Sequence, residues 1–248
     1  MNAMDTYSFS LASSLFSPKR RRLLPFSAIA KAHQLTEEIR VCTNRTCRKQ
    51  GSFQTLETLS SLSPPNLAVK PCACFGRCGA GPNLLLLPDG IIVGHCGTPA
   101  QAAELMANLF PGDFDAKICL DALALKKSAD FQFEKGNFNE AEILLSQIID
   151  FKPFGGIHVT FKCRSSVRLE LGNWSGALQD ANEALRLAPR YHEAYICQGD
   201  VFLELKQFHS AEQSYLAALD IDPLIRRSKS FKARISKLQE KLADANTP

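Results

Sequence analysis

The chain has 248 residues, a length that suits one large domain or two small ones. Hydrophobic residues make up 45% and charged residues 22%, proportions that exclude wholesale disorder and a fibrous repeat. The net charge of +4 is too small to indicate nucleic-acid binding, and no apolar run is long enough to cross a bilayer as a helix.

The first part of the chain, residues 1–37, has the composition of a targeting segment. It is rich in serine and poor in acids, with a basic cluster at Lys19–Arg22. This composition is typical of an organelle transit peptide and predicts a disordered segment. The early serines favour a chloroplast (stroma, or peripheral to the thylakoid), with the mitochondrion as second choice. A plain disordered tail and a nuclear or nucleic-acid patch are the alternatives.

The next segment, residues 38–110, alternates between strand and helix signals. Asp89-Gly90 between two apolar runs predicts a hairpin, and Thr98 is a plausible helix N-cap. The expected elements are strands at 38–42, 67–71, 83–87 and 91–94, and helices at 48–62 and 99–109.

Six of the nine cysteines fall in this segment, which also carries a net charge of +3 from six basic and three acidic residues over 39–109. Two pairs stand out, Cys42-x4-Cys47 and Cys74-x3-Cys78. No pair has the two-residue spacing of a dithiol reductase. Structural zinc and an iron–sulfur cluster both remain open on spacing alone. The glycines around the second pair favour the wider cluster, because they let the backbone approach closely.

These motifs, with the Cys74-Phe-Gly-Arg-Cys78-Gly-Ala-Gly-Pro82 run, resemble the thioredoxin-like [2Fe-2S] ferredoxins. The resemblance implies a one-electron carrier and a [2Fe-2S] cofactor. It also implies that the metal ligands are Cys42, Cys47, Cys74 and Cys78. Cys72 departs from the pattern.

Basic residues lie near the predicted ligands in sequence. They are Arg45, Arg48, Lys49 and Arg77. A basic rim of this kind would steer an acidic redox partner toward the cluster.

After Pro111-Gly112 the periodicity becomes helical and repeats. Three prolines, Pro153, Pro189 and Pro223, are spaced 36 and 34 residues apart, and alanine recurs at the equivalent position before each of them. The pattern resembles tetratricopeptide (TPR) repeats, which implies three helix pairs over 117–223 and a capping helix over 224–243. The second repeat departs from the pattern at Arg168, where an aromatic residue is usual.

Stacked repeats of this kind present a concave groove that binds a peptide or a helix of a protein partner. The candidate groove residues are Lys126, Asp130, Lys162, Ser166, Ile196 and Asp200. The basic and asparagine clamp that grips chaperone tails in similar repeats is absent. The corresponding positions hold Asp130, Cys163, Glu193 and Cys197.

The sequence thus predicts an α+β chain, a small thioredoxin-like ferredoxin domain followed by an all-α TPR solenoid. We expect a chloroplast adaptor that carries a [2Fe-2S] cluster for electron transfer or redox sensing, with a role in assembling photosynthetic or iron–sulfur complexes. The alternative is a non-redox TPR scaffold whose cysteine domain holds zinc or no cluster. No catalytic constellation is found, so an enzyme is not expected, and neither is a nucleic-acid partner.

Overall fold

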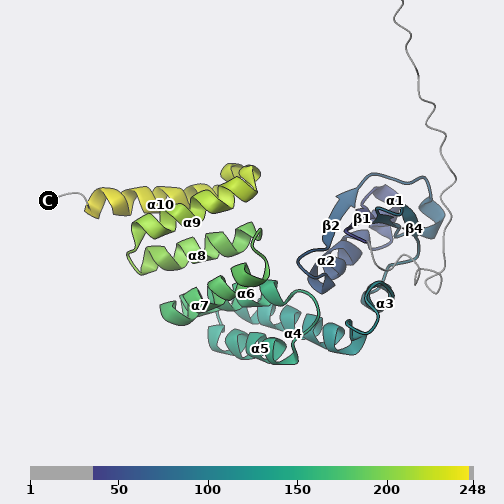
Figure 1. The fold of residues 1–248 in the computed structure, drawn as a ribbon, viewed down its shortest axis with the longest axis horizontal. Coiled ribbons are helices and arrows are strands. Elements are labelled where there is room, and N and C mark those ends of the chain that lie inside the picture. The colour runs from purple at the N-terminus through teal and green to yellow at the C-terminus, as the bar shows by residue number, and fades with distance from the viewer. Residues whose placement is uncertain (1–35, 246–248) are drawn as a thin grey trace, which may run out of the picture.

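The computed structural model describes residues 36–245. A unit that contains the sheet lies at one end, and the helices stack in order away from it toward the C-terminus (Figure 1). The predicted transit peptide falls almost wholly outside the described residues. Its presence and the plastid location therefore stay predictions.

The sheet has four short strands in the order β2-β1-β3-β4. Strand β1 (Glu38–Cys42) pairs in parallel with β2 (Ala68–Cys72) and antiparallel with β3 (Leu84–Leu87), which pairs antiparallel with β4 (Ile91–Val93). Burial of the apolar side chains on β1, β3 and β4 explains why the sheet forms here.

Two helices, α2 (Ser52–Leu62) and α3 (Pro99–Leu109), pack their apolar residues into the same core as the sheet. Thr98 is confirmed as the N-cap of α3, in a capping box with Gln101. The single helix expected from residue 48 is instead divided into α1 (Arg45–Lys49) and α2, because Gly51 takes a left-handed conformation between them.

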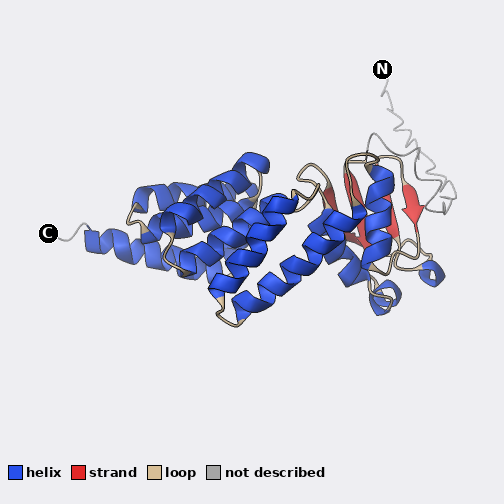
Figure 2. Cartoon of the chain, turned by 90° about the horizontal axis from the view of Figure 1, so that it is seen from below, coloured by secondary structure: helices blue, strands red, loops and turns tan. Residues whose placement is uncertain are grey.

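The helices after the sheet form consecutive antiparallel pairs, drawn in blue in Figure 2. Three pairs are followed by a short 3-10 turn and a final helix. They are α4 (Ala116–Glu134), α5 (Phe138–Phe151), α6 (Ile157–Glu170), α7 (Trp174–Leu187), α8 (His192–Glu204), α9 (Phe208–Ile221), η3 (Pro223–Arg227) and α10 (Lys229–Ala245). Small residues let the paired helices approach, as at Gly199, where a Cβ atom would overlap the buried ring of Tyr215.

The connection between α5 and α6 also packs against the sheet-bearing unit. Phe154 contacts the rings of Phe110 and Phe114, and the amide of Gly156 donates to the carbonyl of Ser63 over 3.2 Å. A Cβ atom on Gly155 would overlap the backbone of Leu62. The first proline spacing is two residues longer than the second. These extra residues lie near Gly155 and Gly156, at a tight contact between the two parts of the chain.

The predicted fold class needs correction. Helices dominate the described residues, and the sheet consists of strands of only five, five, four and three residues. The prediction counted the sheet-bearing segment as a full thioredoxin-like domain and therefore classed the chain as α+β. The apolar runs around the Asp89-Gly90 turn yield only two of these short strands, whereas every repeat yields two long helices. The chain is a mostly helical TPR-like protein that carries a small sheet.

Candidate functional site

The candidate groove residues lie on the first helix of each repeat. Lys126 and Asp130 are on α4, one turn apart, and their side chains form an ion pair with 2.7 Å between Nζ and Oδ2. Burial disfavours the charged ammonium of Lys126, but the neighbouring Cys163 and Asp130 outweigh this and raise its pKa. The lysine side chain is 20% exposed and the aspartate 51%, so the carboxylate is the outer partner.

A second ion pair crosses from α6 to α8. Lys162 Nζ lies 2.9 Å from Glu193 Oε2, and the hydroxyl of Tyr191 donates to the same oxygen over 2.9 Å. Burial by itself raises the pKa of Glu193, but Lys162 and Tyr191 lower it by a larger amount. The pKa is therefore below its ordinary value. Again the lysine is the more buried partner, at 22% exposure against 48%.

Small polar groups lie between α6 and α8. Ser166 Oγ approaches Cys197 Sγ at 3.5 Å, and Cys197 donates to Ser165 Oγ over 3.1 Å. Burial raises the pKa of the Cys197 thiol. Cys197 is thus a small, hydrogen-bonded residue of the repeat interface.

The remaining two candidates lie on α8. Ile196 packs against the apolar cluster shared with α10. Asp200 accepts from Tyr215 at 2.7 Å and from Arg234 of α10 at 2.8 Å on both carboxylate oxygens. Burial raises the pKa of Asp200 although Arg234 and Tyr215 oppose this. The carboxylate of Asp200 is therefore already bound by Arg234 of the terminal helix.

Sequence reasoning missed the roles of Tyr191 and Arg234. Tyr191 precedes α8 as its N-cap residue, and its position two residues before Glu193 was a signal that the sequence could have shown. Arg234 contacts a residue 34 positions earlier. No local pattern marks that contact, because only the docking of α10 creates it.

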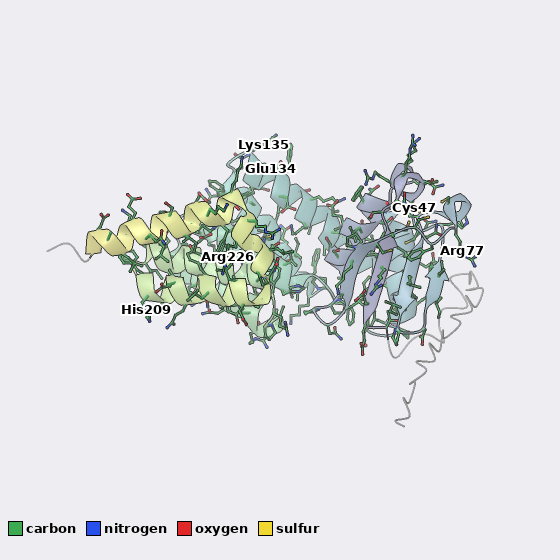
Figure 3. All side chains as sticks on the ribbon, turned by 90° about the horizontal axis from the view of Figure 1, so that it is seen from above. Cys47, Arg77, Glu134, Lys135, His209 and Arg226 are labelled. Atoms are coloured by element: carbon green, nitrogen blue, oxygen red, sulfur yellow. The ribbon has the colours of Figure 1, made fainter. Side chains whose placement is uncertain are left out.

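The four predicted metal ligands fall into two kinds of surroundings. Cys42 and Cys47 are buried, whereas Cys74 and Cys78 are exposed and their sulfur atoms lie 3.6 Å apart. Burial raises the pKa of the Cys42 thiol. A backbone hydrogen bond from Asn44 opposes this rise, whereas the nearby Cys47 and Cys74 add to it. Figure 3 labels Cys47 and Arg77 in the sheet-bearing unit, at the opposite end from the terminal helix.

These residues do not form the predicted cofactor site. Across residues 36–245, no group of three or more His, Cys, Asp or Glu side chains is placed to hold a metal ion. The expectation of a [2Fe-2S] cofactor bound by these cysteines is therefore wrong. The four sulfurs come from the end of β1, from α1, and from the segment around Gly76, but coordination requires all four to converge on one cluster, which sequence spacing alone cannot guarantee.

Comparison with known proteins points to the repeats. An Hsp70-Hsp90 organising protein of Plasmodium falciparum is 30% identical over 119 residues, which are 48% of this chain and 45% of that relative. The heat shock protein STI1 of Saccharomyces cerevisiae is 26% identical over 121 residues, 49% of this chain and 20% of the relative. The chain thus matches less than half the length of these relatives. No protein-family model matches it.

Among solved structures, the first TPR domain of human RPAP3 aligns with a TM-score of 0.45 and 25% identity, over 50% of this chain and 94% of that domain. The TPR2B domain of yeast Sti1, solved in a complex described as pHsp70, aligns with a TM-score of 0.45 and 18% identity, over 50% and 98%.

The sequence relatives correct the prediction of a chloroplast-type ferredoxin. They relate the TPR part of the chain to Hsp70-Hsp90 organising proteins, not to a chloroplast-type ferredoxin. The predictions of an iron–sulfur protein, of electron transfer and of a redox partner at a basic rim are not supported. A protein-binding TPR scaffold is supported, as the alternative predicted. No helix among the described residues has the length and apolar character needed to span a membrane.

Proposed function

We propose that the chain is a non-redox scaffold that binds a segment of a partner protein along the first helices of its repeats, and that it acts by binding, not by catalysis. The observation that carries this is the pair of ion pairs on α4, α6 and α8. In each pair the lysine side chain is mostly buried and the side chain of its carboxylate partner is about half exposed. An arriving segment can contact the outer carboxylates Asp130 and Glu193 without any rearrangement of the helices.

The experiment that tests this uses the full chain to select peptides from a displayed random library. Selected peptides are then measured against a charge-swapped variant, Lys162→Glu with Glu193→Lys, which keeps an ion pair but reverses its direction. We expect about tenfold weaker binding to the swap, because each charge would meet the wrong partner group.

A matched control swaps an ion pair on a second helix, Glu183→Arg with Arg186→Glu. That pair is on α7, where Arg186 is 67% exposed and its Nη2 lies 2.6 Å from Glu183. Peptides that bind the control as well as the wild type, but not the groove swap, support the proposal. Failure to enrich any peptide, or equal binding to both swapped proteins, contradicts it.

A second candidate function is the binding of chaperone C-terminal peptides, which the relatives favour. One solved TPR structure that resembles the repeats is described as bound to the Hsp90 peptide SRMEEVD. That peptide should bind tightly, and Lys126→Ala should abolish its binding, if this candidate holds. The exposed carboxylates Asp130 and Glu193 would repel an acidic peptide, so the main proposal expects no saturable binding of SRMEEVD.

Metal analysis tests the non-redox part separately. The purified chain is assayed for iron and acid-labile sulfide after anaerobic preparation. Iron with an equal amount of sulfide would overturn the non-redox description and leave the peptide-binding proposal standing.

A further inference from the structure

A cavity of about 410 Å³ lies where the ends of α6 and α8 meet the start of α7 and the terminal helix α10. Its walls carry three carboxylates and two cations. Arg234 is bound to Asp200, and Lys237 Nζ lies 2.7 Å from Glu204 Oε1. These two ion pairs leave the third carboxylate, Glu170, in excess. The cavity therefore has a net charge of −1.

An exposed aromatic ring faces the same cavity. Trp174, the first residue of α7, lines it and is 42% exposed. Glu170 is the last residue of α6 and is also exposed. In the part of the chain that the structure describes, no ion pair involves Glu170. A large aromatic face beside an unpaired carboxylate is the chemistry that receives a lysine or arginine side chain.

The same two residue types recur in each repeat at the same spacing. The first helix ends at a glutamate, and an aromatic residue follows four positions later. The three pairs are Glu134 with Phe138, Glu170 with Trp174, and Glu204 with Phe208.

The third repeat shows what such a pair binds. Glu204 is neutralised by Lys237 of α10, and Phe208 packs against the apolar cluster that includes Leu238 of the same helix. One helix thus supplies a basic side chain to the glutamate and an apolar face to the aromatic cluster.

The first repeat differs because its ring is already covered. Phe138 packs edge-on against Phe133 with 5.4 Å between ring centroids. Figure 3 labels Glu134 at this end of α4. Of the three repeats, only the second leaves its aromatic ring strongly exposed beside a glutamate that lacks an ion pair.

We propose that Glu170 and Trp174 form a subsite for a basic side chain, lysine or arginine, of the partner segment. The carboxylate of Glu170 pairs with the cation, and the indole face of Trp174 covers it. This inference rests on the proposed function, because it assigns one chemical feature to the partner that the scaffold binds. It places that feature at the C-terminal end of α6, eight residues beyond Lys162.

The subsite can be measured directly because Trp174 is the chain's one tryptophan. The full chain is titrated with a capped hexa-arginine peptide, and tryptophan emission is recorded. We expect a saturable change in emission that weakens as salt is raised, since the contact is partly exposed. Glu170→Gln should weaken binding of the peptide by about threefold, the effect of losing one exposed charge pair.

Two controls decide the outcome. Glu134→Gln removes the equivalent glutamate of the first repeat and should leave the titration unchanged. A capped hexaglutamate peptide should give no saturable change. The proposal is overturned if hexaglutamate acts like hexa-arginine, if no saturation occurs, or if Glu134→Gln weakens binding as much as Glu170→Gln.

Failure of this subsite and failure of the scaffold function give different results. One result is that the library selects peptides whose binding the Lys162/Glu193 swap abolishes, while hexa-arginine does not change the emission of Trp174. In that case only the subsite is wrong. If hexa-arginine binds at Glu170 and no library peptide is selected, the groove proposal fails and the subsite stands.

Discussion

In the second repeat, Arg168 Nη1 lies 2.9 Å from Asp180 Oδ2, in a carboxylate that is only 4% exposed. Arg164 binds the same carboxylate through two nitrogens at 2.8 Å each, and Arg168 also reaches Glu142 of α5 at 2.6 Å. The position where an aromatic residue is usual therefore holds an arginine that joins three helices. This network explains how the repeat tolerates its departure from the pattern.

Asp180→Ala should strongly destabilise the protein. Removing the carboxylate leaves two partly buried guanidinium groups without their shared partner, which should cost about 3–5 kcal/mol of unfolding free energy. Urea denaturation followed by far-ultraviolet circular dichroism measures this. Asp150→Ala, at an exposed position of α5, is the matched control and should change stability little. A loss at Asp180 no larger than that of the control would show that the network does not stabilise the repeat.

Gly155→Ala should weaken the contact between the sheet-bearing unit and the connection from α5 to α6. The added Cβ would overlap the backbone at Leu62, and overpacking of this kind costs about 1–3 kcal/mol. We expect a lower urea midpoint and faster proteolysis in the connection between α3 and α4. Gly79→Ala serves as control, because its Cβ would meet open space. Equal behaviour of the two variants would contradict the tight junction.

Lys206→Gly should stabilise the third repeat. Lys206 follows α8 with a φ of 58°, a left-handed conformation that the first two repeats give to Gly136 and Gly172. Relief of the side-chain penalty should raise stability by about 1 kcal/mol, seen as a higher urea midpoint. Lys135→Gly, one residue before such a site in a right-handed conformation, should instead lower it. A destabilising effect of Lys206→Gly would show that its side chain has a role of its own.

The Lys162–Glu193 ion pair predicts a pH-dependent contribution to stability. The folded pKa of Glu193 lies below its ordinary value, so the contribution is present above the unfolded pKa of about 4.3 and is lost as pH falls through the folded value. Since Glu193 is half exposed, we expect Glu193→Gln to cost only about 0.5 kcal/mol at neutral pH. Urea denaturation of both proteins across this range should show the difference shrinking as pH falls. A difference that grows toward acid would contradict the assigned sign.

The cysteines should differ widely in reactivity toward iodoacetamide. Cys74 is exposed, and a hydrogen bond from the Gly76 amide at 3.3 Å lowers its pKa, so its thiolate should be alkylated first. Burial raises the pKa of Cys96 to about 12, and this thiol should react last. Timed alkylation with mass spectrometry gives the order. Protection of Cys74 in the native protein would contradict it and would indicate a group bound to that sulfur.

Several features followed from the sequence alone because their causes are local. The spacing of Pro153, Pro189 and Pro223 predicted stacked helix pairs. Thr98 predicted a helix start, because the cap needs only residues within one turn. The hairpin around Asp89-Gly90 followed for the same reason.

Other features required the tertiary structure because they join residues distant along the chain. Cysteine spacing suggested a metal centre, yet whether sulfur atoms converge depends on how separate loops pack. The pairing of Asp200 with Arg234 depends on the docking of α10, and that of Arg168 with Asp180 on two helices that meet across a turn. The proteins to which the repeats are related came from comparison. Local patterns specify elements, whereas the chemistry of a site depends on which elements the packed core brings together.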